Sequence, residues 1–161
     1  MVINRPPNGD SAVAFDYRPG QSAGYLIRDC YRIFSRALET RIARHGVRMG
    51  QWFFLRELWE EDGLSQRELS NRVGMMEPTT VVAIRGMVES GLVRRVKDKN
   101  DRRKVRIHLT AKGRRLKERL LPYAVEVNAI ATQGLTKSEI RIFRTLISRM
   151  KQNLIDANND S

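Results

Sequence analysis

A run of arginine and lysine residues between positions 94 and 106 holds the side chains best suited to binding another molecule. Eight residues there are basic, and only Asp98 and Asp101 are acidic. Residues 92–96 and 102–110 alternate between apolar and polar types, as β-strands do, and the polar residues 97–101 between them indicate a turn. We therefore predict a β-hairpin with a basic tip. One face carries Val105, Ile107 and Leu109, and the other carries Lys104, Arg106 and His108.

Two short helices are predicted directly before this hairpin. Ser65 and Glu68 have the spacing of a capping box, which starts a helix at 65–73. Pro78 suits the first turn of a second helix, 78–90, and a glycine follows each helix. Two short helices with a tight turn and a following β-hairpin are typical of a winged helix-turn-helix. In that fold the second helix enters the major groove of DNA and the hairpin tip reaches a minor groove.

The second short helix has a core face and an opposite face, since successive residues turn by 100°. The core face holds Thr80, Val81, Ile84, Met87 and Val88, and the opposite face holds Pro78, Thr79, Val82, Gly86 and Glu89, flanked by Ala83 and Arg85. Arg85 can pair with a guanine edge or a phosphate, while Thr79 and Val82 can pack on thymine methyl groups. Gly86 permits either close approach to DNA or close packing inside the protein.

Phosphate contacts are expected from two further places. The amides and side chains at the start of the first short helix can hold a phosphate, and they belong to Ser65, Gln66 and Arg67. In the hairpin, phosphates repel Asp101, so we expect this carboxylate to orient Arg102 or Arg103 through a charge-assisted hydrogen bond.

Longer amphipathic helices are predicted on both sides of the winged unit. The helix at about 20–45 has two adjacent apolar stripes, one of Ile27, Tyr31, Phe34, Leu38 and Ile42, the other of Leu26, Cys30, Ile33 and Ala37. A helix at about 49–61 follows, and Thr110 caps another at about 111–132, which Pro122 should kink or restart. A capping box at Thr136 and Glu139 starts the last helix. Its apolar residues have coiled-coil spacing and are Ile140, Phe143, Ile147, Met150 and Leu154.

The first and last helices have little else in the chain to cover them. Packing between two chains is therefore the preferred interpretation, and packing within one chain is the alternative. We expect a mainly α fold with a small β-hairpin wing. It divides into a flexible arm (1–19), a dimerisation helix (20–48), a winged helix-turn-helix DNA-binding domain (49–110) and dimerisation helices (111–161).

Composition narrows the class of protein. The 161 residues suit one compact domain, and a net charge of +12 favours a polyanionic partner. Charge alone does not decide between nucleic acid, an anionic membrane surface and a small polyanion.

Cys30 is the only cysteine and there are two histidines, so we expect no disulfide, metal or cofactor. The chain has no phosphate-binding glycine loop and no nucleophile–base pair, which argues against an enzyme. It has no apolar run of about 18 residues and no secretory signal, so a cytoplasmic location and no membrane association are expected.

Over residues 25–155 the sequence resembles the MarR family of bacterial regulators. The strongest segment is 65–116, which contains GLVRR at 91–95, Asp101-Arg102-Arg103, and Leu109-Thr110 with Gly113. The resemblance implies an obligate, triangular homodimer on a pseudo-palindromic DNA operator, with Arg103, and Arg102 nearby, in the minor groove. Many members carry Thr-Arg at the positions where this chain has Val81-Val82. We therefore expect base contacts from Thr79, Thr80 and Arg85 instead. The predicted DNA contacts are Ser65, Gln66, Arg67, Pro78, Thr79, Thr80, Val82, Arg85, Lys97, Arg102, Arg103 and Lys104.

The resemblance also implies a ligand. Family members commonly bind a small aromatic acid between the dimer base and the DNA-binding lobe, which releases DNA. The segment 50–69 is similar to that of members linked to aromatic-acid breakdown, some of which sense an acyl-CoA thioester. Candidate ligand-binding residues are Tyr25, Arg28, Tyr31, Arg32, Trp52 and Phe53, with the helix around 120–127; the alternative is that these aromatic residues are plain core.

The sequence thus predicts a repressor released from its operator by a small aromatic acid or its acyl-CoA thioester. Two alternatives stay open. One is a redox switch at Cys30, although its apolar stripe favours an inert buried thiol. The other is an architectural protein that binds DNA without sequence preference.

Overall fold

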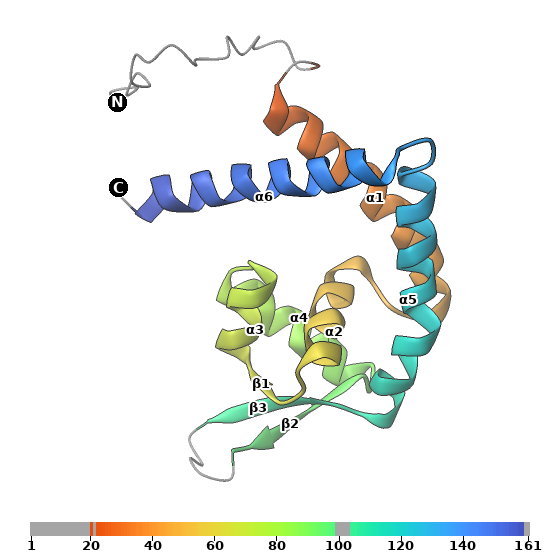
Figure 1. The fold of residues 1–161 in the computed structure, drawn as a ribbon. Helices are drawn as coiled ribbons and strands as arrows, with labels where there is room; N and C mark the ends of the chain where they lie inside the picture. Colours follow the sequence, from red (N-terminus) through yellow and green to blue (C-terminus); the bar gives the residue numbers. More distant parts are fainter. Residues whose placement is uncertain (1–19, 21, 99–103, 160–161) are drawn as a thin grey trace.

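The computed structural model describes residues 20, 22–98 and 104–159, and it is mainly helical with a small antiparallel sheet (Figure 1). The winged helix-turn-helix and its flanking helices appear in the predicted order. The elements are α1 (Ala23–Ile42), a 3-10 turn η1 (Ala43–His45), α2 (Met49–Glu60), β1 (Leu64–Ser65), α3 (Gln66–Val73), α4 (Glu77–Glu89), β2 (Val93–Lys97), β3 (Val105–Leu109), α5 (Ala111–Ala131) and α6 (Lys137–Asn159).

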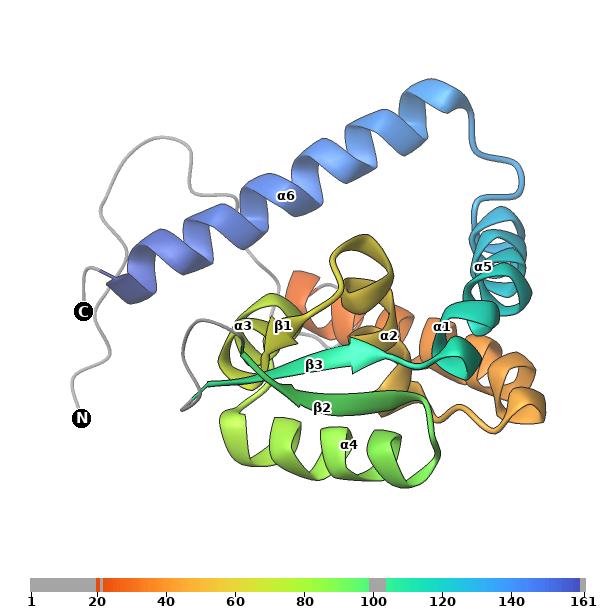
Figure 2. The same cartoon turned by 90° about the horizontal axis from the view of Figure 1, so that it is seen from below.

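The sheet has the order β1-β3-β2, with β3 antiparallel to both neighbours. Strands β2 and β3 form the predicted hairpin, in register from Val93 opposite Leu109 to Lys97 opposite Val105. The short strand β1 was not predicted, since two residues are too few to show a periodic pattern. Helix α4 packs beside β2 (Figure 2). On β3, Ile107 and Leu109 are buried as predicted, whereas Val105, near the hairpin tip, is 40% exposed.

The core is centred on α2 and the elements that pack around it. Helix α2 alone contributes Trp52, Phe54, Leu55, Leu58 and Trp59. The largest fully buried side chains elsewhere are Ile42, Leu64, Leu69, Ile84, Met87, Leu92, Ile107 and Leu120. The DNA-binding lobe thus has its own apolar core, to which α1 and α5 each add a few residues.

Helix α5 runs through Pro122 as one helix, so the restart that we considered at this residue does not occur. Pro122 and Glu118, the residue four positions earlier, are both exposed. The Glu118 carbonyl that loses its helical partner can therefore be hydrated, which makes the proline tolerable.

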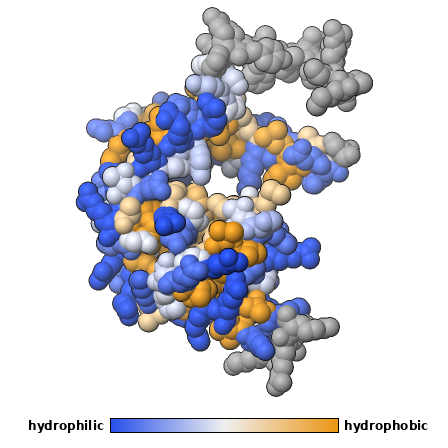
Figure 3. Space-filling view, turned by 180° about the vertical axis from the view of Figure 1, so that it is seen from behind, coloured by the Kyte–Doolittle hydropathy of each residue, from blue (hydrophilic) through white to orange (hydrophobic). Residues whose placement is uncertain are grey.

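Helix α6 projects from the end of α5 as a long arm (Figure 1). Every residue in it is exposed or half-buried, including Ile142, Phe143 and Leu146, which are between 50% and 59% exposed. Figure 3 shows apolar side chains at the surface of this arm. Helix α1 is similarly uncovered, with Leu26 and Ile33 more than half exposed. Within the described parts of the chain, no helix is long and apolar enough to cross a membrane.

The lobe is joined to α5 at Gly113, which is buried against the start of β2. The Trp59 indole Nε1–H donates a hydrogen bond of 3.0 Å to the Gly113 carbonyl, and the backbone N–H of Thr110 donates one of 3.0 Å to the Leu92 carbonyl. A Cβ atom on Gly113 would lie 2.2 Å from that Leu92 oxygen. Because a backbone atom occupies this space, only glycine fits without moving β2 relative to α5.

We predict that Gly113→Ala lowers the free energy of unfolding by about 2–3 kcal/mol, the cost of overpacking a closely packed site. Urea denaturation followed by helical circular dichroism, at one fixed protein concentration, measures this. The matched control is Gly50→Ala in α2, where no described atom lies within 4 Å of the added Cβ. The control should be neutral or more stable by up to about 1 kcal/mol. Equal stability of the two variants would show that the joint tolerates a side chain.

Candidate nucleic-acid interface

Helix α4 presents a small exposed face suited to the major groove. The first turn of α4 contains Pro78, as predicted. Pro78, Thr79 and Arg85 are exposed, and Val82 is 67% exposed. The Gly86 position is half-buried, and an added Cβ would meet only Gln51 Nε2 at 3.9 Å, so internal packing does not require glycine there.

The expectation that Thr80 contacts DNA is wrong. This residue is 1% exposed, and its Oγ1 is buried with no hydrogen-bond partner among the described residues. The helical period places Thr80 one turn before Ile84, which is fully buried on the same face. The expected core position of Val88 is only partly right, since this residue near the helix end is 38% exposed.

The start of α3 is built by the predicted capping box. The Glu68 backbone N–H donates to Ser65 Oγ at 3.2 Å, and the Ser65 N–H donates to Glu68 Oε2 at 2.7 Å. The hydrogen bonds from Ser65 lower the pKa of Glu68, with a smaller contribution from the positive charge of Arg106. Glu68 therefore stays ionised at neutral pH, and its carboxylate takes the Ser65 N–H that an incoming phosphate would need.

The other predicted contacts near α3 are differently placed. Arg67 is exposed, whereas Gln66 is half-buried and its Oε1 accepts a hydrogen bond of 3.0 Å from Arg95 Nη2 on β2. A groove of about 370 Å³ brings three predicted residues together, because Ser65, Arg67 and Lys104 all line it, with Glu68, Asn71 and Arg106. This groove runs between α3 and β3, at the base of the hairpin tip.

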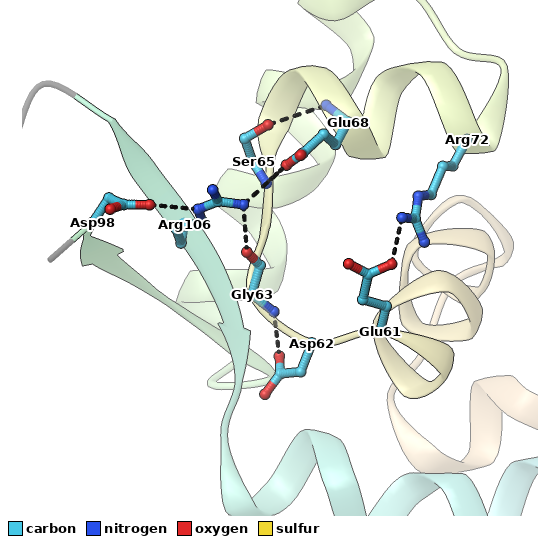
Figure 4. Close-up of polar contacts among 8 residues, drawn as sticks. All are labelled: Glu61, Asp62, Gly63, Ser65, Glu68, Arg72, Asp98 and Arg106. Atoms are coloured by element: carbon cyan, nitrogen blue, oxygen red, sulfur yellow. Dashed lines mark hydrogen bonds and ion pairs between the residues drawn. The ribbon is translucent and has the colours of Figure 1, made fainter. Parts of the chain in front are cut away.

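In the wing, one arginine is turned toward the protein. Arg106 Nε lies 2.7 Å from Asp98 Oδ2, and its Nη1 lies 3.3 Å from both the Gly63 carbonyl and Glu68 Oε2 (Figure 4). The hydrogen bond to Asp98 raises the pKa of Arg106, so this side chain is a permanent cation. Lys97 and Lys104 are exposed. Arg102 and Arg103, which we expect in the minor groove, and Asp101, which we expect to orient them, lie outside the described residues.

The predicted ligand-binding residues fall into two groups. A pocket of about 160 Å³ between α1, α2 and α5 brings Tyr31, Trp52 and Phe53 together. The remaining three do not line it. Arg28 stacks on the Tyr25 ring at 4.8 Å, and Arg32 pairs with Asp29 at 2.7 Å, a contact that raises the pKa of Arg32.

The pocket also holds polar residues that sequence reasoning missed. Arg56 lies at its wall, 5.8 Å above the Trp52 ring, and Asn128 comes from α5. The Oγ of Ser35 is buried with no hydrogen-bond partner among the described residues. Only the (i, i+4) spacing of Trp52 and Arg56 could have signalled this from the sequence.

Cys30 is exposed in the single chain, contrary to the expected buried thiol. It lies in an apolar groove of about 580 Å³ between α1 and α6, which Leu26, Ile27, Tyr31, Phe34, Phe143 and Ile147 also line. The thiol is therefore on an apolar stripe as predicted, but no described part of the same chain covers the stripe.

Comparison with known proteins supports the same class. The sequence model of the MarR family matches residues 47–105. The HTH-type transcriptional regulator TtmR of Methylorubrum extorquens is 35% identical over 123 residues, which are 75% of this chain and 61% of that protein. A MarR transcriptional regulator from Methanosarcina mazei Go1 superposes with a TM-score of 0.76 at 31% identity, over 83% of this chain and 96% of the other. The PcaV transcriptional regulator of Streptomyces coelicolor was solved with its natural ligand. It superposes with a TM-score of 0.76 at 26% identity, over 85% of this chain and 96% of that protein.

The fold and this surface define a DNA-binding regulator of transcription with a winged helix-turn-helix, not an enzyme. The match with TtmR spans less than two thirds of that relative's length. The identity with the Methanosarcina mazei regulator extends over nearly all of that protein. The chain belongs to the MarR family, as the resemblance indicated.

Proposed function

We propose that this protein is a cytoplasmic homodimeric repressor that binds a pseudo-palindromic operator and is released by a small aromatic acid. The observation that carries this proposal is the exposed face of α4, with Thr79, Val82 and Arg85, beside a basic hairpin. The α4 face reads base edges in a major groove, and the hairpin tip with Arg102 and Arg103 enters the adjacent minor groove.

The uncovered apolar faces of α1 and α6 support a dimer. Isolated exposed apolar residues are ordinary, but two adjoining helices that share an apolar groove form a contiguous patch. A second copy would cover the patch with the same helices, since homodimer interfaces are self-complementary. The dimer then places two copies of α4 for the two halves of one operator.

The operator proposal predicts different losses for two arginines. Arg85→Ala should weaken binding to the operator by about 1–3 kcal/mol and have little effect on unrelated DNA, because it removes a base contact. Arg67→Gln should weaken binding to both and lower the salt slope of log K by about 0.9, the value for one lost phosphate contact. Arg103→Ala should cause a large loss of operator affinity while the dimer stays intact.

These losses are measured by mobility shift with duplexes that tile the DNA beside the protein's own gene, and with scrambled duplexes of equal length. Light scattering checks the dimer. Equal affinity of the unaltered protein for operator and scrambled duplexes would favour the architectural alternative. An Arg103→Ala variant that binds as tightly as the unaltered protein would remove the wing from the mechanism.

The pocket between α1, α2 and α5 supports the ligand half of the proposal. Its volume of about 160 Å³ suits one aromatic ring, since an apolar cavity of about 150 Å³ in another protein holds benzene. The rings of Tyr31, Trp52 and Phe53 line it, and Arg56 offers a cation for a carboxylate. A whole CoA thioester is too large for the pocket, so only its acyl group could enter. PcaV, of the same fold, was solved with its natural ligand.

We predict that Arg56→Gln raises the concentration of aromatic acid needed for half-release of DNA at least tenfold and leaves ligand-free DNA binding unchanged. The probes are benzoate, hydroxybenzoates and their CoA thioesters, added to the preformed complex in the mobility-shift assay. Arg28→Gln is the matched control, because Arg28 lies on α1 outside this pocket. If no acid or ester releases DNA, the sensor role fails; if Arg28→Gln has the larger effect, the site lies elsewhere.

A further inference from the structure

We propose that Arg106 is a positioning residue that fixes the direction of the wing relative to α3, rather than a phosphate contact. This inference rests on the proposed grip of DNA by α4 and the wing. Arg106 is one of the eight cations of the hairpin, and the sequence alone gives it the same character as its neighbours. The contacts of its guanidinium distinguish it.

Three segments of the chain supply acceptors to this one side chain. Asp98 follows the end of β2, Gly63 lies in the loop before β1, and Glu68 belongs to the first turn of α3. Figure 4 shows the guanidinium between Asp98 on one side and the Ser65–Glu68 capping box on the other. The Arg106 side chain is 35% exposed and that of Asp98 only 15%, so water screens the pair less than a fully exposed one.

The position of Arg106 in the sheet explains how these contacts can hold the wing in place. It lies in the middle strand, opposite Ser65 of β1 and Val96 of β2. The backbone N–H of Asp98 donates to the Lys104 carbonyl at 2.9 Å, a bond that closes the hairpin where the tip begins. The Arg106–Asp98 ion pair therefore holds the two strands together where the hairpin tip begins. The contacts of Arg106 to Gly63 and Glu68 connect the same place to the loop before β1 and to α3. On the neighbouring strand, Arg95 makes a second tie to α3 through Gln66.

The electrostatics argue against a phosphate on Arg106. Its Nε and Nη1 donors are directed at two carboxylates and a carbonyl of the protein. A phosphate near this guanidinium would meet the negative charges of Asp98 and Glu68 at short range, which is repulsive. Charges suited to phosphate are the exposed Lys97, Lys104 and Arg67 around it.

The two roles make opposite predictions for Asp98→Asn. If cations near Asp98 act only by attracting phosphate, removal of this negative charge should strengthen DNA binding. If the ion pair positions the wing, Asp98→Asn should weaken binding, because the amide holds a guanidinium less firmly than a carboxylate does. Weaker DNA binding by Asp98→Asn would therefore be the opposite of the change that net charge alone predicts.

We predict that Arg106→Gln and Asp98→Asn each weaken operator binding roughly tenfold. The slope of log K against log salt should stay unchanged for Arg106→Gln. The double variant should lose less affinity than the sum of the two single losses, since both substitutions remove the Arg106–Asp98 pair. Arg106→Lys keeps the charge but loses the planar fork, so it should lose affinity like Arg106→Gln. The matched control, Lys97→Gln on the same hairpin, should lower the slope by about 0.9.

The operator affinity of each variant is measured by titration between 50 and 300 mM KCl, with thermal unfolding recorded alongside. Tighter binding by Asp98→Asn, or a lower slope for Arg106→Gln, would overturn the inference, as would full affinity in Arg106→Lys. The unaltered protein is titrated first. A failure of the proposed function therefore appears as no operator preference in that protein, whereas a failure of this inference appears only in the variants.

Discussion

The close contact between Gly113 and the Leu92 carbonyl fixes where the DNA-binding lobe sits on α5. At this point the backbone of α5 meets the backbone of Leu92, the residue just before β2, with no side chain between them, and the Trp59 indole donates to the Gly113 carbonyl. The hydroxyl of Thr110, which caps α5, also donates to the Gly91 carbonyl at 2.6 Å. One short stretch of chain thus joins α2, the end of α4, the first wing strand and the long helix. The direction of the wing relative to α5 depends on it.

The proposed ligand pocket adjoins this joint. Trp52 forms part of the pocket wall and packs edge-on against Trp59, with 5.6 Å between ring centroids. The Lys117 ammonium of α5 donates to the Trp59 carbonyl at 3.2 Å, so Trp59 is held by α5 from both ends. A ring bound beside Trp52 would therefore press on the residue that connects the lobe to α5, which gives the proposed release of DNA a physical route.

Local signals explain how much of this could be predicted from the sequence. Capping residues such as Ser65 and Thr110 mark helix starts through bonds within one turn, and they were interpreted correctly. The prediction of a DNA contact at Thr80 was wrong because it followed the family resemblance, whereas the helical period correctly places this residue in the core. Residues that meet across the fold were missed, since no spacing reveals that Arg106 reaches Glu68 or that Asn128 of α5 shares a pocket with Trp52. Charge counts likewise cannot separate an inward arginine from an outward lysine.

Hydroxyl-radical footprinting of the protein on its operator duplex tests the two-groove grip most directly. A dimer that places α4 in the major groove and the wing in the minor groove should protect two symmetric half-sites, with centres about one helical turn, 10–10.5 base pairs, apart. Each should be flanked by a shorter protected stretch in the minor groove. Uniform protection along the duplex, or a single patch without the flanking minor-groove protection, would contradict this mode of binding.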